Sequence, residues 1–307
     1  MRLKQASGVT LIELLIALVI SAILVGGTYS LFVTQQKAYS VQHQVAALQQ
    51  DARVALAMMS QEIRMAGFLV GAGSGSGFSD GTNNIAIDAF TDAVVPVNST
   101  SAPDGITVVY AAEELGQIQS VSTGVVTLDT NVDSYFKDSG GSLIAERLFV
   151  AFEFRPDKLY RVTAVDGTNV TVANVPALGI PAGTRVYGVK AITYSVNAGI
   201  LTRNENSGDG AQPVAGDGAS TVVEDVQFAY QVRGDSTWYN GGALPAGKTN
   251  ADIRTVRISL LIRTAIEDPE DTGYSRTALE DHLAVATSDG YRRRMYGTVV
   301  KIRNLRG

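Results

Sequence analysis

The sequence predicts an α+β protein in which a long N-terminal helix packs on a mainly antiparallel, β-rich globular head. Two observations predict this class. Residues 9–66 are first predominantly apolar and then apolar at helical spacing. From residue 105 onward, short β-branched runs alternate with turn residues, which is typical of strands. A long helix followed by strands of this kind is an α+β arrangement.

The N-terminal part of the helix is long and apolar enough to cross a membrane. No residue from Leu14 to Gln36 is charged, and the hydrocarbon core of a bilayer needs roughly 20 helical residues. Arg2 and Lys4 precede this span, and the positive-inside bias would keep them in the cytoplasm. We therefore expect a single-pass precursor in the inner membrane, spanning it at about residues 14–36, with its N-terminus inside and its C-terminus outside.

Glu13 is a carboxylate at the start of this apolar span. A charge at the centre of a membrane helix costs about 2.5–3.5 kcal/mol on insertion scales, so an intramembrane acid calls for a partner. Cleavage after Gly8 would give Val9 a free cationic amine, and the amine of one subunit could pair with Glu13 of its neighbour. Opposite charges about 4 Å apart attract by roughly 4 kcal/mol at an effective dielectric of 20, which would offset this penalty.

The basic leader, Gly8 and residues 10–18 together resemble the class III signal of type IV prepilins and type II secretion pseudopilins. The resemblance implies that prepilin peptidase removes leader residues 1–8, cutting between Gly8 and Val9, and methylates the new amine of Val9. It also implies that Glu13 serves subunit docking. The family usually has phenylalanine where this chain has Val9.

Later segments are similar to the PilW-like minor pilins of type IV pili: 53–56 with 62–68, then 253–264, and 291–294. This resemblance implies a minor pilin that primes pilus assembly or is incorporated into the pilus, ending in a periplasmic or extracellular fibre. Its partners would be other minor pilins, the major pilin, prepilin peptidase, the inner-membrane assembly platform, membrane lipid and, in some systems, a tip adhesin. Functions in motility, adhesion, DNA uptake and secretion all stay open.

The N-terminus and the function each have alternative interpretations. A secretory signal peptide would have a shorter apolar core of about 7–15 residues and a cleavage site after it, and a plain anchor has no use for Glu13. For the function, a minor pseudopilin of a type II secretion system is the alternative within the class. A pilin-anchored adhesin or binding module, with ligand contacts in loops 204–220 or 238–247, is the alternative outside it.

Beyond the membrane the predicted helix becomes amphipathic. Apolar residues recur at spacings of three and four, which places them on one stripe: Val41, Val45, Leu48, Ala52, Leu56, Met59 and Ile63. We expect this stripe to lie on the globular head, and Gly67 to be the left-handed C-cap of the helix. Gly26-Gly27 marks either a site of partial unwinding or a site of close helix packing.

The predicted organisation is a leader at 1–8, a helix at 9–67, a glycine-rich connecting region at 68–104 and the head at 105–307. A loop-rich stretch at 204–220 is a candidate subdomain boundary or a long exposed loop. The expected strands are 106–111, 124–128, 148–155, 158–165, 169–173, 185–196, 201–203, 221–233, 254–264 and 297–303.

The composition argues against most kinds of chemistry. The chain has no cysteine and two histidines, His43 and His282, far apart in sequence, so we expect no catalytic site, no metal site and no cofactor, and the chain should not be an enzyme. The acidic run 267–271 lacks EF-hand spacing and predicts a solvated turn rather than a calcium site.

The densest basic cluster is Arg292, Arg293 and Arg294. The net charge of the chain is −5, and the cluster carries no row of aromatic residues, so nucleic acid is an unlikely partner. We expect either a protein contact or solvated arginines.

Overall fold

The fold is taken from a computed structural model, which describes residues 9–80, 84–87, 90–174, 179–206, 210–268, 273–276, 278–287 and 289–305. Helix α1 spans Leu11–Met65, which confirms the predicted long helix. The chain forms two compact units, Met1–Ala47 and Leu48–Gly307. We call them the first and the second unit, and α1 contributes residues to both.

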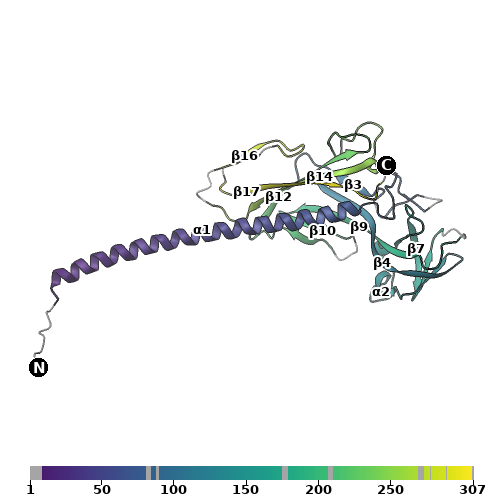
Figure 1. The fold of residues 1–307 in the computed structure, drawn as a ribbon, viewed down its shortest axis with the longest axis horizontal. Coiled ribbons are helices and arrows are strands. Elements are labelled where there is room, and N and C mark those ends of the chain that lie inside the picture. Colours follow the sequence, from purple (N-terminus) through teal and green to yellow (C-terminus); the bar gives the residue numbers. More distant parts are fainter. Residues whose placement is uncertain are drawn as a thin grey trace, which may run out of the picture. The chain divides into compact units, whose positions relative to one another are not determined.

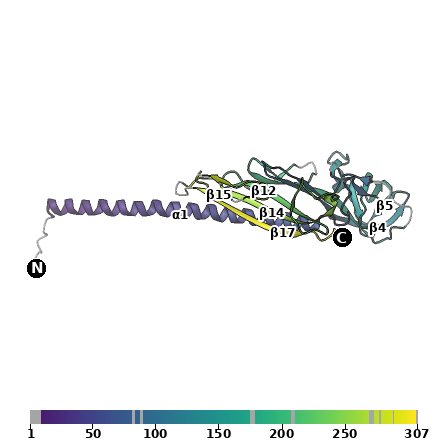
Figure 2. The ribbon, with the colours of Figure 1, turned by 90° about the horizontal axis from the view of Figure 1, so that it is seen from above.

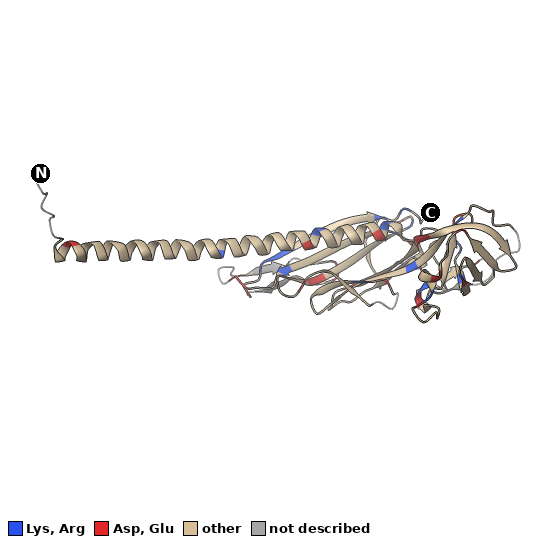
Figure 3. Cartoon of the chain, turned by 90° about the horizontal axis from the view of Figure 1, so that it is seen from below, with Lys and Arg blue, Asp and Glu red and all other residues tan. Residues whose placement is uncertain are grey.

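In the first unit, the apolar side chains of α1 from Leu11 to Phe32 are exposed. Leu11 is 79% exposed, Leu18 60% and Val25 67%. Between Glu13 and Lys37 the helix carries no charged residue, as Figure 3 shows. Helix α1 is therefore long and apolar enough to cross a membrane.

In the second unit, α1 buries one stripe of small and apolar residues: Leu48, Ala52, Ala55, Met59 and Ile63. The predicted stripe is confirmed at four of these positions, whereas Leu56 is only partly buried and packs at the margin of the core. Ala55, which the prediction left out, is fully buried. A small residue there lets the helix approach the strands beneath it closely.

Gly67 ends the helix in the predicted left-handed conformation, with φ of +76°. Its N–H donates to the carbonyl of Val109 (2.9 Å), which joins the helix end to a strand. A Cβ at this position would overlap the side chain of Leu305. Glycine is therefore required by the backbone conformation and by the space available.

The larger sheet of the second unit has nine strands, and all its pairs are antiparallel. Their order is β11 (Gln212–Ala215), β10 (Ile200–Asn204), β9 (Arg185–Asn197), β6 (Phe149–Phe152), β7 (Tyr160–Asp166), β8 (Asn169–Val172), β5 (Val125–Leu128), β4 (Gly105–Ser122) and β3 (Val94–Val97). Strand β9 also pairs directly with β4. Strand β11, in the stretch predicted as a candidate boundary, pairs with β10.

The smaller antiparallel sheet has the order β13 (Tyr239–Asn240), β12 (Thr221–Val232), β14 (Ile253–Thr264) and β17 (Arg293–Lys301). Two short hairpins, β1 (Phe78–Ser79) with β2 (Asn84–Ile85) and β15 (Tyr274–Arg276) with β16 (Val285–Thr287), complete the strands, and α2 spans Asp133–Phe136. Figures 1 and 2 show β12, β14 and β17 side by side in the second unit. Every strand predicted from the sequence forms.

The second unit has two hydrophobic cores. The larger lies beneath α1 and combines its stripe with residues of both sheets, such as Val108 of β4 and Ile258 of β14. The region predicted as a connecting segment contributes the buried residues Phe78, Ile87 and Val94 to this core. The smaller core gathers α2 with β5 to β8. Since the chain has no cysteine, packing supplies the stability that disulfides give to many exported domains.

Candidate functional site

The N-terminal processing site is only partly covered by the structure. Gly8 lies outside the described residues, so the Gly8–Val9 bond stays a prediction. Val9 is the first described residue, and it is 74% exposed. The α-helix begins two residues later, at Leu11.

Glu13 closes the first turn of α1 through Thr10. The backbone N–H and the Oγ1 hydroxyl of Thr10 both donate to Glu13 Oε2 at 2.9 Å. In return, the N–H of Glu13 donates to Thr10 Oγ1 at 3.3 Å. This reciprocal pattern is a capping box, and the Thr-x-x-Glu spacing that identifies it is visible in the sequence. It holds the carboxylate at the N-terminal end of the helix.

Arg293 of the basic cluster forms ion pairs within the chain. Its side chain is 3% exposed and pairs with Glu224 at 2.7 Å and with Asp289 at 2.6 Å. The hydrogen bond from Arg293 lowers the pKa of Asp289 to about 2. Arg293 is therefore a structural ion-pair residue that ties β17 to β12.

The two neighbours of Arg293 differ from it and from each other. Arg292 is partly exposed and binds Asp268 through two nitrogens, at 2.9 and 2.5 Å. Arg294 is exposed and, within the described part of the chain, forms no ion pair. The alternation of side chains along a strand places Arg293 and Arg294 on opposite faces of the sheet. Of the three arginines, Arg294 is the one best placed for the predicted protein contact.

Glu62 fixes α1 to the larger sheet, a role that the sequence did not reveal. Arg203 of β10 donates to Glu62 Oε1 through Nε at 2.8 Å and through Nη2 at 2.7 Å. Tyr194 of β9 donates its hydroxyl to Glu62 Oε2 at 2.6 Å. Burial and the nearby Glu62 carboxylate raise the pKa of Tyr194. Both partners lie more than 130 residues away in the sequence, so no local sequence pattern predicts these contacts.

His282 is buried and structural. Its Nδ1 lies 2.6 Å from Asp225 Oδ2, and its Nε2 lies 3.0 Å from the backbone carbonyl oxygen of Ser99. Nearby, burial raises the pKa of Asp104 to about 6, although the N–H groups of Phe228 and Ser99 stabilise its charge. Because Nε2 faces a carbonyl rather than a hydroxyl, this histidine has no nucleophile to activate.

Two family models match the sequence. The prokaryotic N-terminal methylation motif covers residues 3–29, and type IV pilus-assembly protein W (PilW) covers residues 186–304. The chain is a type IV pilin-like protein that carries a prepilin methylation motif and a PilW domain. This agrees with the resemblance found at both ends of the sequence. Both models describe structural pilins, which are not enzymes.

No curated protein matches the sequence. Among solved structures, a type IV-like pilin from Thermus thermophilus matches with 15% identity and a TM-score of 0.41, covering 84% of this chain and 98% of that one.

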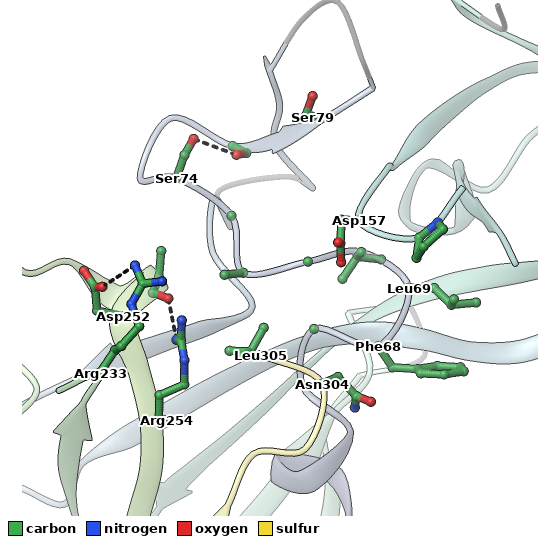
Figure 4. A pocket seen from close by; sticks show the side chains of 18 of the residues that line it. Phe68, Leu69, Ser74, Ser79, Asp157, Arg233, Asp252, Arg254, Asn304 and Leu305 are labelled. Atoms are coloured by element: carbon green, nitrogen blue, oxygen red, sulfur yellow. Dashed lines mark hydrogen bonds and ion pairs between the residues drawn. The ribbon is translucent and has the colours of Figure 1, made fainter. Parts of the chain in front are cut away.

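The pocket drawn in Figure 4 is a hollow of about 750 Å³ in the second unit. Three of its charged groups are engaged within the fold. Arg233 pairs with Asp252 at 3.3 Å, and Arg254 donates to the carbonyls of Ala251 and Ile253. Burial, with a smaller effect of Arg233, lowers the pKa of Arg254. Its described lining residues thus form no catalytic constellation.

Among the described residues, no group of three or more histidines and carboxylates could hold a metal ion. In the acidic run 267–271, residues 269–271 lie outside the described part of the chain, and Asp268 binds Arg292. The absence of a metal site therefore stays a prediction for this run.

Proposed function

We propose that this PilW-like pilin is a minor pilin that primes assembly of a type IV pilus or is incorporated into it. The methylation motif at residues 3–29 supports an N-terminus of the prepilin type. The exposed apolar surface of α1 in the first unit supports a membrane-anchored precursor. After processing, the chain would leave the inner membrane for a periplasmic or extracellular pilus.

The mechanism begins with cleavage between Gly8 and Val9 by prepilin peptidase, followed by methylation of the Val9 amine. The observation that carries the proposal is the position of Glu13, a carboxylate in the first turn of an exposed apolar helix, hydrogen-bonded to Thr10 of its own turn. In an apolar assembly this charge needs a cation. The Val9 amine of a neighbouring subunit would supply it and fix the register between the two helices.

The partners follow from this mechanism. They are other minor pilins, the major pilin, prepilin peptidase, the inner-membrane platform and membrane lipid, with a tip adhesin in some systems. A minor pseudopilin of a type II secretion system would use the same processing and the same glutamate. Measuring which output fails in a strain lacking the protein, piliation or secretion, separates the two functions.

The first experiment is mass spectrometry of the mature chain, with variants that separate charge from capping. Wild type is expected to begin at a methylated Val9, and Gly8→Val is expected to keep its leader. Glu13→Ala and Glu13→Gln should be cleaved but should fail to assemble. The glutamine retains an oxygen that can accept from Thr10, so it tests the charge alone. An intact N-terminus in wild type, or a soluble chain lacking its first 30 or so residues, would refute the proposal.

A further inference from the structure

Strand β17 forms one edge of the smaller sheet. It pairs with β14 along its whole length, from Arg293 opposite Arg263 to Lys301 opposite Thr255. Among the described residues, no strand pairs with its other side. Figure 2 shows β17 at the border of this sheet. The N–H and C=O groups along such an edge can form a ladder with a strand from another chain.

The outer face of this edge is apolar at its centre. Met295 and Val299 are 51% and 53% exposed, and Gly297 lies between them. Because side chains alternate along a strand, these three positions share one face. An added strand could therefore lay apolar side chains on Met295 and Val299, over the gap that the glycine leaves.

The surroundings of this edge are basic, although the whole chain has a net charge of −5. Arg294 and Lys301, near the two ends of β17, are exposed. Three further exposed arginines line the adjacent hollow between α1 and β17, namely Arg53, Arg64 and Arg303. Glu62 also lines this hollow, but its carboxylate forms an ion pair with Arg203.

This charge pattern opposes pairing between two copies of β17. An antiparallel pair centred on Gly297 would place Lys301 of each copy opposite Arg293 and one position from Arg294 of the other copy. Arg293 is already paired with Glu224 and Asp289, so the repulsion would come from Arg294 and Lys301, and like charges on neighbouring strands destabilise a strand pair. Lysines and arginines on an edge strand commonly serve to prevent such self-association. The same charges favour a partner strand that carries carboxylates.

We propose that the free edge of β17 binds an extended acidic segment of another protein by strand addition. The segment would carry apolar side chains at alternate positions over Met295 and Val299, and carboxylates about seven residues apart facing Arg294 and Lys301. An odd separation places those carboxylates on opposite faces of the added strand, as the alternation along β17 requires. The proposal is independent of N-terminal processing and of docking through Glu13.

The test uses the full chain in detergent micelles and two fluorescently labelled octapeptides. The acidic probe is Asp-Val-Thr-Val-Thr-Val-Thr-Asp. Added parallel to β17 with its first residue opposite Arg294, it places valines opposite Met295 and Val299 and its last residue opposite Lys301. The basic probe has lysine at both ends. The acidic probe is expected to bind at least tenfold more tightly by fluorescence polarisation. It should also slow amide hydrogen exchange in residues 294–301. Failure of the acidic probe to bind, equal binding of both probes, or protection confined to other strands would overturn the proposal.

Two matched variants locate the site. Lys301→Glu reverses an exposed charge beside the edge and should weaken the acidic probe at least tenfold, while improving binding of the basic probe. Arg161→Glu makes the same charge change at an exposed position of β7 and should leave both affinities within twofold. Unchanged melting temperatures would show that both variants fold. Equal losses in the two variants would mean that net charge, and not this edge, governs binding.

Discussion

The two parts of α1 have the same backbone geometry and opposite surroundings. In the first unit its apolar residues cover all sides and are exposed, as at Leu18 and Val25. In the second unit they form one stripe, and Met59 and Ile63 are fully buried. The apolar stripe of the second part packs on the strands beneath it. The first part has no apolar partner within its own unit, so its sequence suits surroundings supplied from outside, a bilayer or the helices of other subunits.

Glu62 and Glu13 of α1 differ in the same way, because only one of the two charges is neutralised within the chain. Glu62 forms an ion pair with Arg203 and accepts a hydrogen bond from the hydroxyl of Tyr194, both within the fold. Glu13 accepts hydrogen bonds from Thr10 of its own turn, which stabilise the carboxylate but do not neutralise it. A carboxylate that is paired with a cation inside the fold holds elements of the fold together. A carboxylate that is not neutralised can bind a cation of another molecule.

The largest expected effect comes from breaking the internal pair. Glu62→Ala leaves Tyr194 without its acceptor and Arg203 with Glu205 (2.7 Å) as its remaining carboxylate partner. Losing both contacts should lower the free energy of unfolding of the second unit by about 3–5 kcal/mol. Chemical denaturation of the full chain in detergent measures this. Glu13→Ala is the control and should leave that free energy unchanged. A loss below about 1 kcal/mol for Glu62→Ala would mean that the pair does not fasten α1 to the sheet.

A smaller effect is expected from truncating apolar residues. Ile63→Ala removes a fully buried side chain and should cost about 2–4 kcal/mol in the same denaturation experiment. Ile20→Ala makes the identical change where the side chain is 52% exposed, and should not alter unfolding of the second unit. Equal effects of the two substitutions would contradict the difference between the two parts of the helix.

Local patterns in the sequence predicted most of the fold. The helix, its stripe, the left-handed Gly67 and the positions of the strands follow from spacing and turn residues, which act over a few residues. The long extension of β4 to Ser122 was missed, because residues such as Glu113 and Gly116 weaken the strand pattern. These residues still pair with β9, and that pairing is decided by a segment about 70 residues away.

The candidate site divides in the same way. The cleavage and docking residues came from a motif, and the Thr10-x-x-Glu13 capping box could have been read from its spacing. The separation of Arg293 from Arg294 could not, because a run of arginines in a sequence resembles one basic patch. Only the pairing of β17 within its sheet brings Arg293 to Glu224, 69 residues earlier in the chain.

The smallest expected effect concerns the capping of Glu13 rather than its charge. Thr10→Ala removes the hydroxyl that donates to Glu13 and accepts from it, and should destabilise the first turn of α1 by about 1 kcal/mol. Faster hydrogen exchange of the amides at residues 13–15 in detergent would reveal this loss. Assembly should persist, because the carboxylate keeps its charge, whereas Glu13→Gln keeps an acceptor and loses assembly. If Thr10→Ala abolished assembly as completely as Glu13→Gln, the geometry of the cap, and not attraction between unlike charges, would govern docking.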